Sequence, residues 1–272
     1  MRSLLLIADD FGLNEAVDAG ILQLAQAKRL SGISCLTQLE RWPVAARALG
    51  SLSPVQIGLH LNFSQAFGKG WHAPLPELIV RAYLRALPVG RIRESLNVQW
   101  GRFTEAMGRA PDFVDGHQHV HQLPVIREAM LALIDREGAT PWLRVTHPLL
   151  APDGGLKSQL IRHLGARSLR LQAAAQGLRL PPAFAGVYDF SGDEARYAER
   201  FARWVQALPN QAVVMCHPGR AAPPSVEDPI AAARPHEWAF FSSPRFDAVM
   251  TEAQCQLAFD LAPGLAPTEV AR

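Results

Sequence analysis

The sequence predicts an α/β protein in which parallel strands alternate with helices, as a barrel or as an open sheet. Short apolar runs are repeatedly followed by segments with helical spacing, an order that requires right-handed crossovers between parallel strands. The chain has 272 residues, of which 49% are apolar and 19% charged, so it is long enough to bury one substantial core without disulfides. No repeat or low-complexity linker interrupts it, and we therefore expect a single domain over residues 1–272.

The first third of the chain alternates strands and helices. Residues 4–8 form a continuous apolar run typical of a strand buried on both faces. Asn14 is a plausible N-cap for a helix that continues to about Lys28. The next expected elements are a strand over 31–39, a helix over 43–51 and a strand over 55–61.

The remaining elements follow the same order with two irregular regions. Residues 63–90 predict a long loop with some helix, and loops of that length are uncommon unless they are functional. Residues 148–182 predict an irregular or helical insertion. We expect helices over 91–107, 124–136 and 192–208, strands near 111–114, 142–145 and 212–216, and a helix followed by a strand over 243–261.

Composition excludes several classes of function. The formal net charge is +2, and the 27 basic residues are scattered rather than clustered, which argues against nucleic-acid binding. The apolar run near the N-terminus is too short for a signal peptide or a membrane span. Cys35, Cys216 and Cys255 form no close pair, which is typical of reduced thiols. A cytoplasmic protein is the expectation.

Polar side chains follow four of the expected strands at the point where each strand ends. They are the pair Asp9 and Asp10, then His60, His117 and His217. The carboxyl ends of parallel strands meet at one edge of a sheet or one mouth of a barrel, where active sites are assembled. The sequence therefore predicts that these segments converge on one site.

Histidines and aspartates at one mouth point to a catalytic divalent metal. One carboxylate and two imidazoles leave positions open for water on the ion, whereas a structural site is closed. Adjacent residues point different ways, so one aspartate is expected to bind the ion while the other stays free as a base. Each residue also has an ordinary structural explanation, as a turn, a helix cap or a core histidine. His117, His119 and His121 would share one face on a strand, whereas a helix would bring only His117 and His121 together.

Four motifs resemble the YdjC family of carbohydrate deacetylases. They are Ala-Asp-Asp-Phe-Gly at 8–12, Gly-Leu-His-Leu-Asn at 58–62, Asp-Gly-His-Gln-His-Val-His at 115–121 and Met-Cys-His-Pro-Gly at 215–219. The resemblance covers nearly the whole chain. It implies a (β/α) barrel of the glycoside hydrolase and deacetylase type, distorted or seven-stranded, that removes N-acetyl groups from acetylated sugars with a divalent metal.

The resemblance also implies roles for individual residues. Asp10, His60 and His117 correspond to the metal ligands, Asp9 to the base that activates water, and His217 to the acid that protonates the leaving nitrogen. Zinc or magnesium is the expected ion, and cobalt, nickel or manganese would also suit this ligand set. A homodimer would be unsurprising.

Further residues are candidates for contact with the sugar. We expect Arg144, on the strand over 142–145, either to pair with a catalytic carboxylate or to lie on the surface. Aromatic side chains of the 63–90 loop are expected either to stack on sugar rings or to pack locally. Gly116 and Gln118 replace residues common in the family, which could alter substrate choice. The substrate-binding candidates are Arg144, His119, His121 and Asn62, and the loop aromatics are Phe63, Phe67 and Trp71.

Three other functions compete with the deacetylase. A hydrolase of another amide or ester on the same fold cannot be separated from it by sequence. A non-catalytic sugar-binding relative would be expected to lose part of the base, acid and ligand set, yet all five positions are intact here. A phosphodiesterase has no support from a glycine-rich phosphate loop or a basic cluster.

Overall fold

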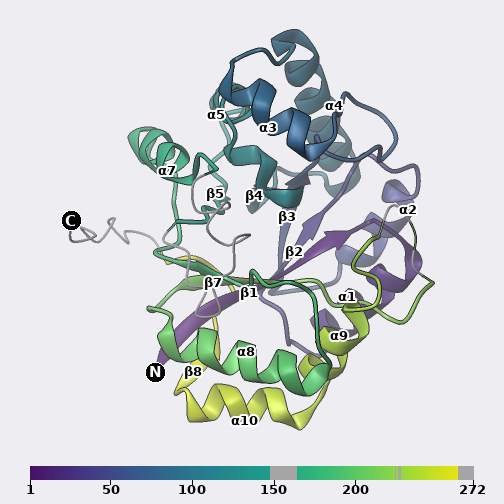
Figure 1. Ribbon diagram of the computed structural model, residues 1–272, viewed down its shortest axis with the longest axis vertical. Helices are drawn as coiled ribbons and strands as arrows, with labels where there is room; N and C mark the ends of the chain where they lie inside the picture. The colour runs from purple at the N-terminus through teal and green to yellow at the C-terminus, as the bar shows by residue number, and fades with distance from the viewer. Residues whose placement is uncertain (148–163, 224, 226–227, 263–272) are drawn as a thin grey trace.

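A curled sheet of eight parallel strands lies at the centre of the part of the chain that the computed structural model describes, residues 1–147, 164–223, 225 and 228–262 (Figure 1). The main path of the sheet has seven strands in the order β5-β4-β3-β2-β1-β7-β6, and β8 pairs with the start of β1. The strands are β1 (Arg2–Phe11), β2 (Gly32–Cys35), β3 (Gln56–Leu61), β4 (Phe113–Gly116), β5 (Trp142–Leu143), β6 (Phe184–Ala185), β7 (Ala212–Cys216) and β8 (Cys255–Leu257).

Helices pack around the outside of this sheet (Figure 1). Helix α9 contacts both α1 and α8, which brings the last quarter of the chain against its beginning. The helices are α1 (Glu15–Gln26), α2 (Trp42–Ala46), α3 (Leu75–Tyr83), α4 (Val89–Met107), α5 (Ile126–Arg136), α7 (Ala166–Ala175), α8 (Glu194–Ala207), α9 (Arg234–Ser242) and α10 (Pro244–Glu252), with 3₁₀ segments η1 (Arg47–Leu49) and η2 (His117–Gln122).

Local sequence signals set the ends of several helices. The side chain of Asn14 accepts a hydrogen bond from the backbone N–H of Val17, 2.9 Å away, and so caps α1 as expected. Helix α4 ends at Gly108, whose φ of 68° is the left-handed conformation that glycine adopts without steric cost. These signals fix where the connections between strands begin.

Alternation along the strands divides the core into two parts. On β1, Leu4, Leu6 and Ala8 pack against the surrounding helices, whereas Leu5 and Ile7 belong to a smaller cluster inside the curled sheet. Phe113 and Trp142 stack inside this cluster, with ring centroids 4.6 Å apart. The interior of the sheet is therefore filled with side chains, and the site lies above this filling.

The expected (β/α) barrel is confirmed in a distorted, incomplete form, with seven of its eight strands on one path. Its main path ends at β5 and β6, and no ladder pairs these two strands among the described residues. The gap is partly bridged by a hydrogen bond from the backbone N–H of Leu143 to the carbonyl of Arg179, 3.1 Å away. The strand ends thus form an incomplete ring around one mouth.

The helix expected within residues 63–90 is α3, whose apolar face packs against the fold. Other elements differ from the sequence expectation. Helix α9 and the short β6 were not predicted. Part of the expected insertion, residues 148–163, lies outside the described residues, and its later part contains α7.

The three cysteines form no disulfide. Cys35, Cys216 and Cys255 are all buried free thiols. Among the described residues, no helix combines the length and the apolar character needed to cross a membrane.

Candidate metal and catalytic site

Both aspartates at the end of β1 reach the same mouth because the strand is irregular there. Asp9 continues the inward alternation of Leu5 and Ile7. Asp10 would point to the opposite face on a regular strand, but it has a left-handed φ of 69°, and the pairing with β2 shifts register between Ala8 and Phe11. Both carboxylates consequently line one cavity. A non-glycine residue held in this conformation costs on the order of 1–3 kcal/mol, a strain typical of functional sites.

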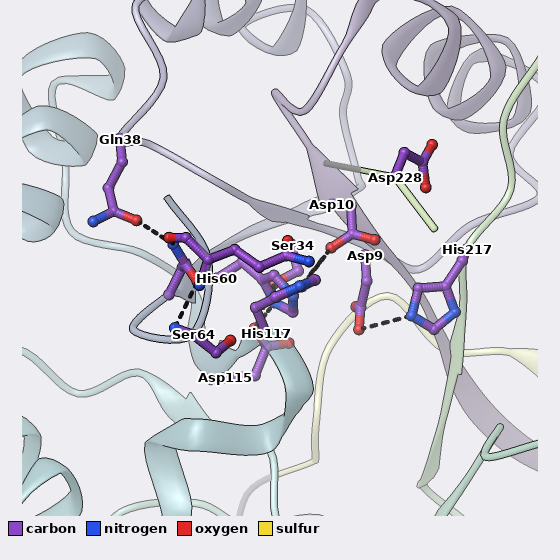
Figure 2. Close-up of polar contacts among 12 residues, drawn as sticks. Asp9, Asp10, Ser34, Gln38, His60, Ser64, Asp115, His117, His217 and Asp228 are labelled. Atoms are coloured by element: carbon purple, nitrogen blue, oxygen red, sulfur yellow. Dashed lines mark hydrogen bonds and ion pairs between the residues drawn. The ribbon is translucent and has the colours of Figure 1, made fainter. Parts of the chain in front are cut away.

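Asp10, His60 and His117 form a group whose ligand atoms all lie within 4.8 Å of one another. Oδ1 of Asp10 is 3.5 Å from Nε2 of His60 and 3.0 Å from Nδ1 of His117 (Figure 2). Ligand atoms about 2.0–2.1 Å from a tetrahedral ion lie about 3.3 Å apart, so the spacing fits a metal of zinc's size. The other ring nitrogen of His117, Nε2, is buried without a hydrogen-bond partner. The donor types and their spacing therefore fit a divalent ion.

His60 is oriented by a carboxylate on its other side. Nδ1 of His60 is 2.6 Å from Oδ1 of Asp115, and the hydroxyl of Ser34 donates to the same oxygen. The register of β3 and β4 places His60 directly beside Asp115. Burial opposes a charge on His60, but the carboxylates of Asp115 and Asp9 raise its pKa to about 10. The surroundings thus favour a positive charge at this point, and Asp115 holds the His60 ring with its Nε2 facing Asp10.

The second oxygen of Asp10 is held by an arginine from α9. NH2 of Arg234 donates to Oδ2 of Asp10 over 2.8 Å, and its Nε lies 2.9 Å from both oxygens of Asp228. Burial would raise the pKa of Asp10, but Arg234 and His117 outweigh this effect and hold it well below the usual value. Asp10 is therefore an ionised carboxylate whose Oδ1 remains directed at the two histidines.

Asp9 forms a paired hydrogen bond with a buried arginine. NH1 and NH2 of Arg144 donate to its two oxygens over 2.6 and 2.7 Å, and NH2 also lies 2.7 Å from Oδ2 of Asp115. Burial raises the pKa of Asp9, although the Arg144 guanidinium opposes that shift. This fork fixes the orientation of the Asp9 carboxylate, and its elevated pKa suits a group that accepts a proton.

His217 faces Asp9 across the mouth. Its Nε2 lies 4.0 Å from Oδ2 of Asp9, as Figure 2 shows. The backbone N–H of His217 donates to Oε2 of Glu237 over 2.6 Å, and the ring packs edge-on against Phe190. Burial lowers the pKa of His217 to about 3, against the opposing effect of the Asp10 carboxylate. The imidazole is thus neutral at neutral pH and fixed beside the candidate base.

The site opens into a cavity of about 310 Å³. Asp9, Asp10 and the three histidines His60, His117 and His217 all line it, so the structure brings together the five residues that the sequence predicted for catalysis and metal binding. Their functional roles remain predictions. The cavity wall also includes Gln65, Leu75, Ile79, Gly116, Gln118, His119, Leu164, Val187, Tyr188, Phe190, Met215, Pro229, Ile230 and Arg234.

His119 is the substrate-binding candidate that lies at the cavity. Residues 117–122 form the 3₁₀ segment η2 rather than a strand or an α-helix, and Gln118 and His119 both have positive φ. This turn separates the three histidines instead of aligning them on one face. His119 is 5% exposed, and its Nδ1 has no hydrogen-bond partner. The residue therefore lines the cavity while its Nδ1 stays buried and unpaired.

Arg144, His121 and Asn62 do not line the cavity, which argues against direct contact with substrate. Arg144 pairs with a carboxylate of the site, the first of the two placements expected for it. His121 is fully buried, with Nε2 2.9 Å from the Arg144 carbonyl. Asn62 is also buried, and its side chain bonds to the backbone of Ser64 and Gln65, shaping the loop after β3. All three are buried residues that hold neighbouring parts of the site in place without lining the cavity.

The loop aromatics expected to stack on sugars are mostly core residues. Phe63 is fully buried and Phe67 is 2% exposed, and the Phe67 ring lies 5.6 Å from that of His117. Trp71 is half-buried and packs against the main core. None of the three lines the cavity. Local packing, the alternative explanation, accounts for them.

Sequence reasoning missed four supporting residues. Asp115 belongs to a quoted motif, and its pairing with His60 follows from the strand register. Ser34 lies on β2 with no motif of its own. Arg234 and Glu237 come from α9, which carries no pattern linking it to a strand end.

Known proteins resemble this chain over much of its length. A mouse (Mus musculus) protein named carbohydrate deacetylase is 29% identical over 93% of this chain and 92% of its own length. A chitooligosaccharide deacetylase from Serratia marcescens is 28% identical over 80% of this chain and 82% of its own. One from Proteus mirabilis is 32% identical, but the match spans 47% of this chain and 55% of that protein.

The fold also has a counterpart among solved structures. A protein from Enterococcus faecalis V583, named provisionally as a cellobiose-phosphate cleavage protein, superimposes with a TM-score of 0.67 at 18% identity, over 94% of this chain and 97% of its own. At this identity the likeness concerns the fold alone. The sequence model of the YdjC-like proteins matches residues 3–252, a span that includes every residue of the site described above. The chain therefore belongs to the YdjC-like protein family.

Proposed function

We propose that this protein is a metal-dependent carbohydrate deacetylase, which hydrolyses the N-acetyl group of an amino sugar to acetate and a free amine. One observation carries the proposal. The trio Asp10, His60 and His117 adjoins a carboxylate fixed by an arginine, and a neutral histidine lies 4.0 Å from that carboxylate. The names of the relatives, which are carbohydrate and chitooligosaccharide deacetylases, agree with this chemistry.

Asp10, His60 and His117 would hold the ion. Two imidazoles and one carboxylate suit zinc, cobalt or nickel better than magnesium, which prefers oxygen ligands. A divalent ion bound here supplies a polarised amide carbonyl and a water of lowered pKa. Arg234 neutralises the second oxygen of Asp10, so that a single carboxylate oxygen faces the ion.

Asp9 and His217 would move the protons. Asp9 accepts a proton from the attacking water, while Arg144 keeps its carboxylate in one orientation. A neutral His217 must gain a proton before it acts as an acid, and Asp9 is the proton carrier 4.0 Å from its Nε2. His217 then donates to the departing sugar nitrogen. His119, on the cavity wall, would contact the sugar.

Two variants test this assignment. Asp9→Asn keeps the shape of the site but removes the base, so we expect acetate release from N-acetylglucosamine derivatives to fall by about 10²–10⁴-fold with the metal content unchanged. His60→Ala should lose the metal as well as the activity. Asp247→Asn, the same change in a surface ion pair with Arg29, is the matched control and should behave as the unmodified protein. Full activity of a metal-loaded Asp9→Asn protein would show that Asp9 is not the base.

A further inference from the structure

The cavity wall is largely apolar away from the metal and proton-transfer residues. Among the described residues, eight of its side chains are hydrocarbon, aromatic or thioether groups, contributed by α3, by the segment before α7, by the segment after β6, by β7 and by the approach to α9. They are Leu75, Ile79, Leu164, Val187, Phe190, Met215, Pro229 and Ile230. A pocket of this kind binds apolar groups by removing their surface from water.

These side chains lie at two depths. Val187 and Met215 are each 5% exposed and belong to the cluster that fills the curled sheet, so they form the base of the cavity. Met215 is two residues from His217 on the same face of its strand, which places this base beside the reacting groups. Leu75 and Ile79 are half-buried on α3, at the mouth. The base suits the methyl of an acetyl group, and the mouth faces the rest of the substrate.

Helix α3 forms one apolar side of the cavity. Leu75 and Ile79 are spaced four residues apart, so they lie one after the other on the same side of the helix. Tyr83, one turn further on, lines a second cavity with Arg127 and His147. The apolar surface that α3 offers to a bound molecule therefore consists of Leu75 and Ile79.

Among the described residues, few side chains on the wall can form hydrogen bonds. Outside the metal and proton-transfer residues and Arg234, the polar side chains are those of Gln65, Gln118, His119 and Tyr188. The Tyr188 hydroxyl already donates to Glu237 over 2.5 Å. Gln65, Gln118 and His119 can serve the hydroxyls of one sugar ring, whereas a second ring would leave hydroxyls unpaired against an apolar wall.

We propose that the substrate is an N-acetylated amino sugar whose glycosidic substituent is apolar, and that Leu75 and Ile79 of α3 hold this substituent. The proposal rests on the deacetylase function. The glycosidic bond stays intact, because water is added across the amide alone. It assigns the mouth of the cavity to a hydrocarbon group rather than to further sugars.

Four probes test the proposal with the metal-loaded protein. They are the methyl and the octyl β-glycosides of N-acetylglucosamine, the methyl glycoside of N-octanoylglucosamine, and N,N′-diacetylchitobiose, all below their micelle concentrations. We expect kcat/KM for the octyl glycoside to exceed that for the methyl glycoside by about tenfold or more, since burial of each methylene contributes up to about 0.8 kcal/mol. Equal values for the two glycosides, or a preference for chitobiose, would overturn the proposal. A preference for the N-octanoyl sugar would assign the apolar wall to the acyl group and overturn it too.

Two variants on α3 test whether this helix causes the preference for the octyl glycoside. Ile79→Gln should reduce the octyl-to-methyl ratio of kcat/KM by about fivefold. Val80→Gln makes a similar change at a position that is 57% exposed and not on the cavity wall, so the ratio should stay the same. A ratio that is unaffected by Ile79→Gln, or equally affected by both variants, contradicts the role of α3.

Binding measurements distinguish an error in this substrate proposal from an error in the proposed deacetylase function. If no probe is hydrolysed, the deacetylase function is wrong, and calorimetry then compares the octyl and methyl glycosides as ligands. Tighter binding of the octyl glycoside, weakened by Ile79→Gln, would still support an apolar subsite. Equal binding would refute it.

Discussion

Replacing Asp115 with asparagine should weaken metal binding without touching a metal ligand. Oδ1 of Asp115 lies 2.6 Å from Nδ1 of His60 and accepts a hydrogen bond from the Ser34 hydroxyl. Its Oδ2 lies 2.7 Å from NH2 of Arg144. An asparagine has one carbonyl oxygen, so its amide N–H₂ must face either the imidazole or the guanidinium, both of which are donors. Either orientation removes a charge-assisted contact in a fully buried setting.

The expected loss has two measurable parts. Removing a carboxylate that orients a metal-binding histidine typically costs 10–100-fold in metal affinity, and we expect about this factor for Asp115→Asn. The unpaired buried donor should also lower the free energy of unfolding of the metal-free protein by about 2–4 kcal/mol. Competition with a chromophoric chelator measures the first effect, and denaturant unfolding of the stripped protein measures the second.

Two further variants serve as controls for Asp115→Asn. Asp247→Asn, in an exposed pair with Arg29, should change neither quantity. Ser34→Ala removes a single hydrogen bond to Asp115 and should weaken the metal by only a few-fold, which keeps the reasoning testable if Asp115→Asn does not fold. An unchanged metal affinity in a folded Asp115→Asn protein would refute the idea that Asp115 orients His60.

Two further predictions concern buried charges near the site. Arg144→Met should shift the acidic limb of the pH–activity profile to higher pH, because the guanidinium now opposes the rise in the pKa of Asp9, and a limb that does not move would contradict this role. Glu237→Gln should flatten the pH dependence of stability: burial raises the pKa of Glu237 from 4.5 to about 7, so the folded protein holds its proton more tightly and stability falls as pH rises through that window. The unmodified protein should lose about 3 kcal/mol of unfolding free energy from this group, measured by urea unfolding at pH 4.5 and pH 8, and a slope that persists in the variant would assign it to another residue.

The position of the site could be predicted from the sequence because side chains alternate strictly between the two faces of a strand. Asp9 follows Leu5 and Ile7 inward, and Asp115 follows Phe113 in the same way. Once the apolar runs are recognised as parallel strands, the polar residues that end them must meet at one mouth. Asp115 could have been assigned by extending this argument, since it lies beside His60 in the register of β3 and β4.

Other features depend on geometry that a sequence pattern does not contain. The left-handed backbone at Asp10 turns its side chain to the same mouth as that of Asp9, and no residue type marks the register shift. Three alternating histidines predicted a strand or a helix, whereas positive φ at Gln118 and His119 makes a tight turn. Arg234 reaches Asp10 only because α9 packs against α1, a contact between distant segments.

The pairing of Asp10 with Arg234 joins residues that are 224 positions apart in the chain. Asp10, His60 and His117 all lie within the first 117 residues, whereas the guanidinium that neutralises the second oxygen of Asp10 comes from α9. An ion pair between residues this far apart forms only when the end of the chain packs against its beginning. The charge balance at Asp10 therefore depends on the docking of α9 against α1.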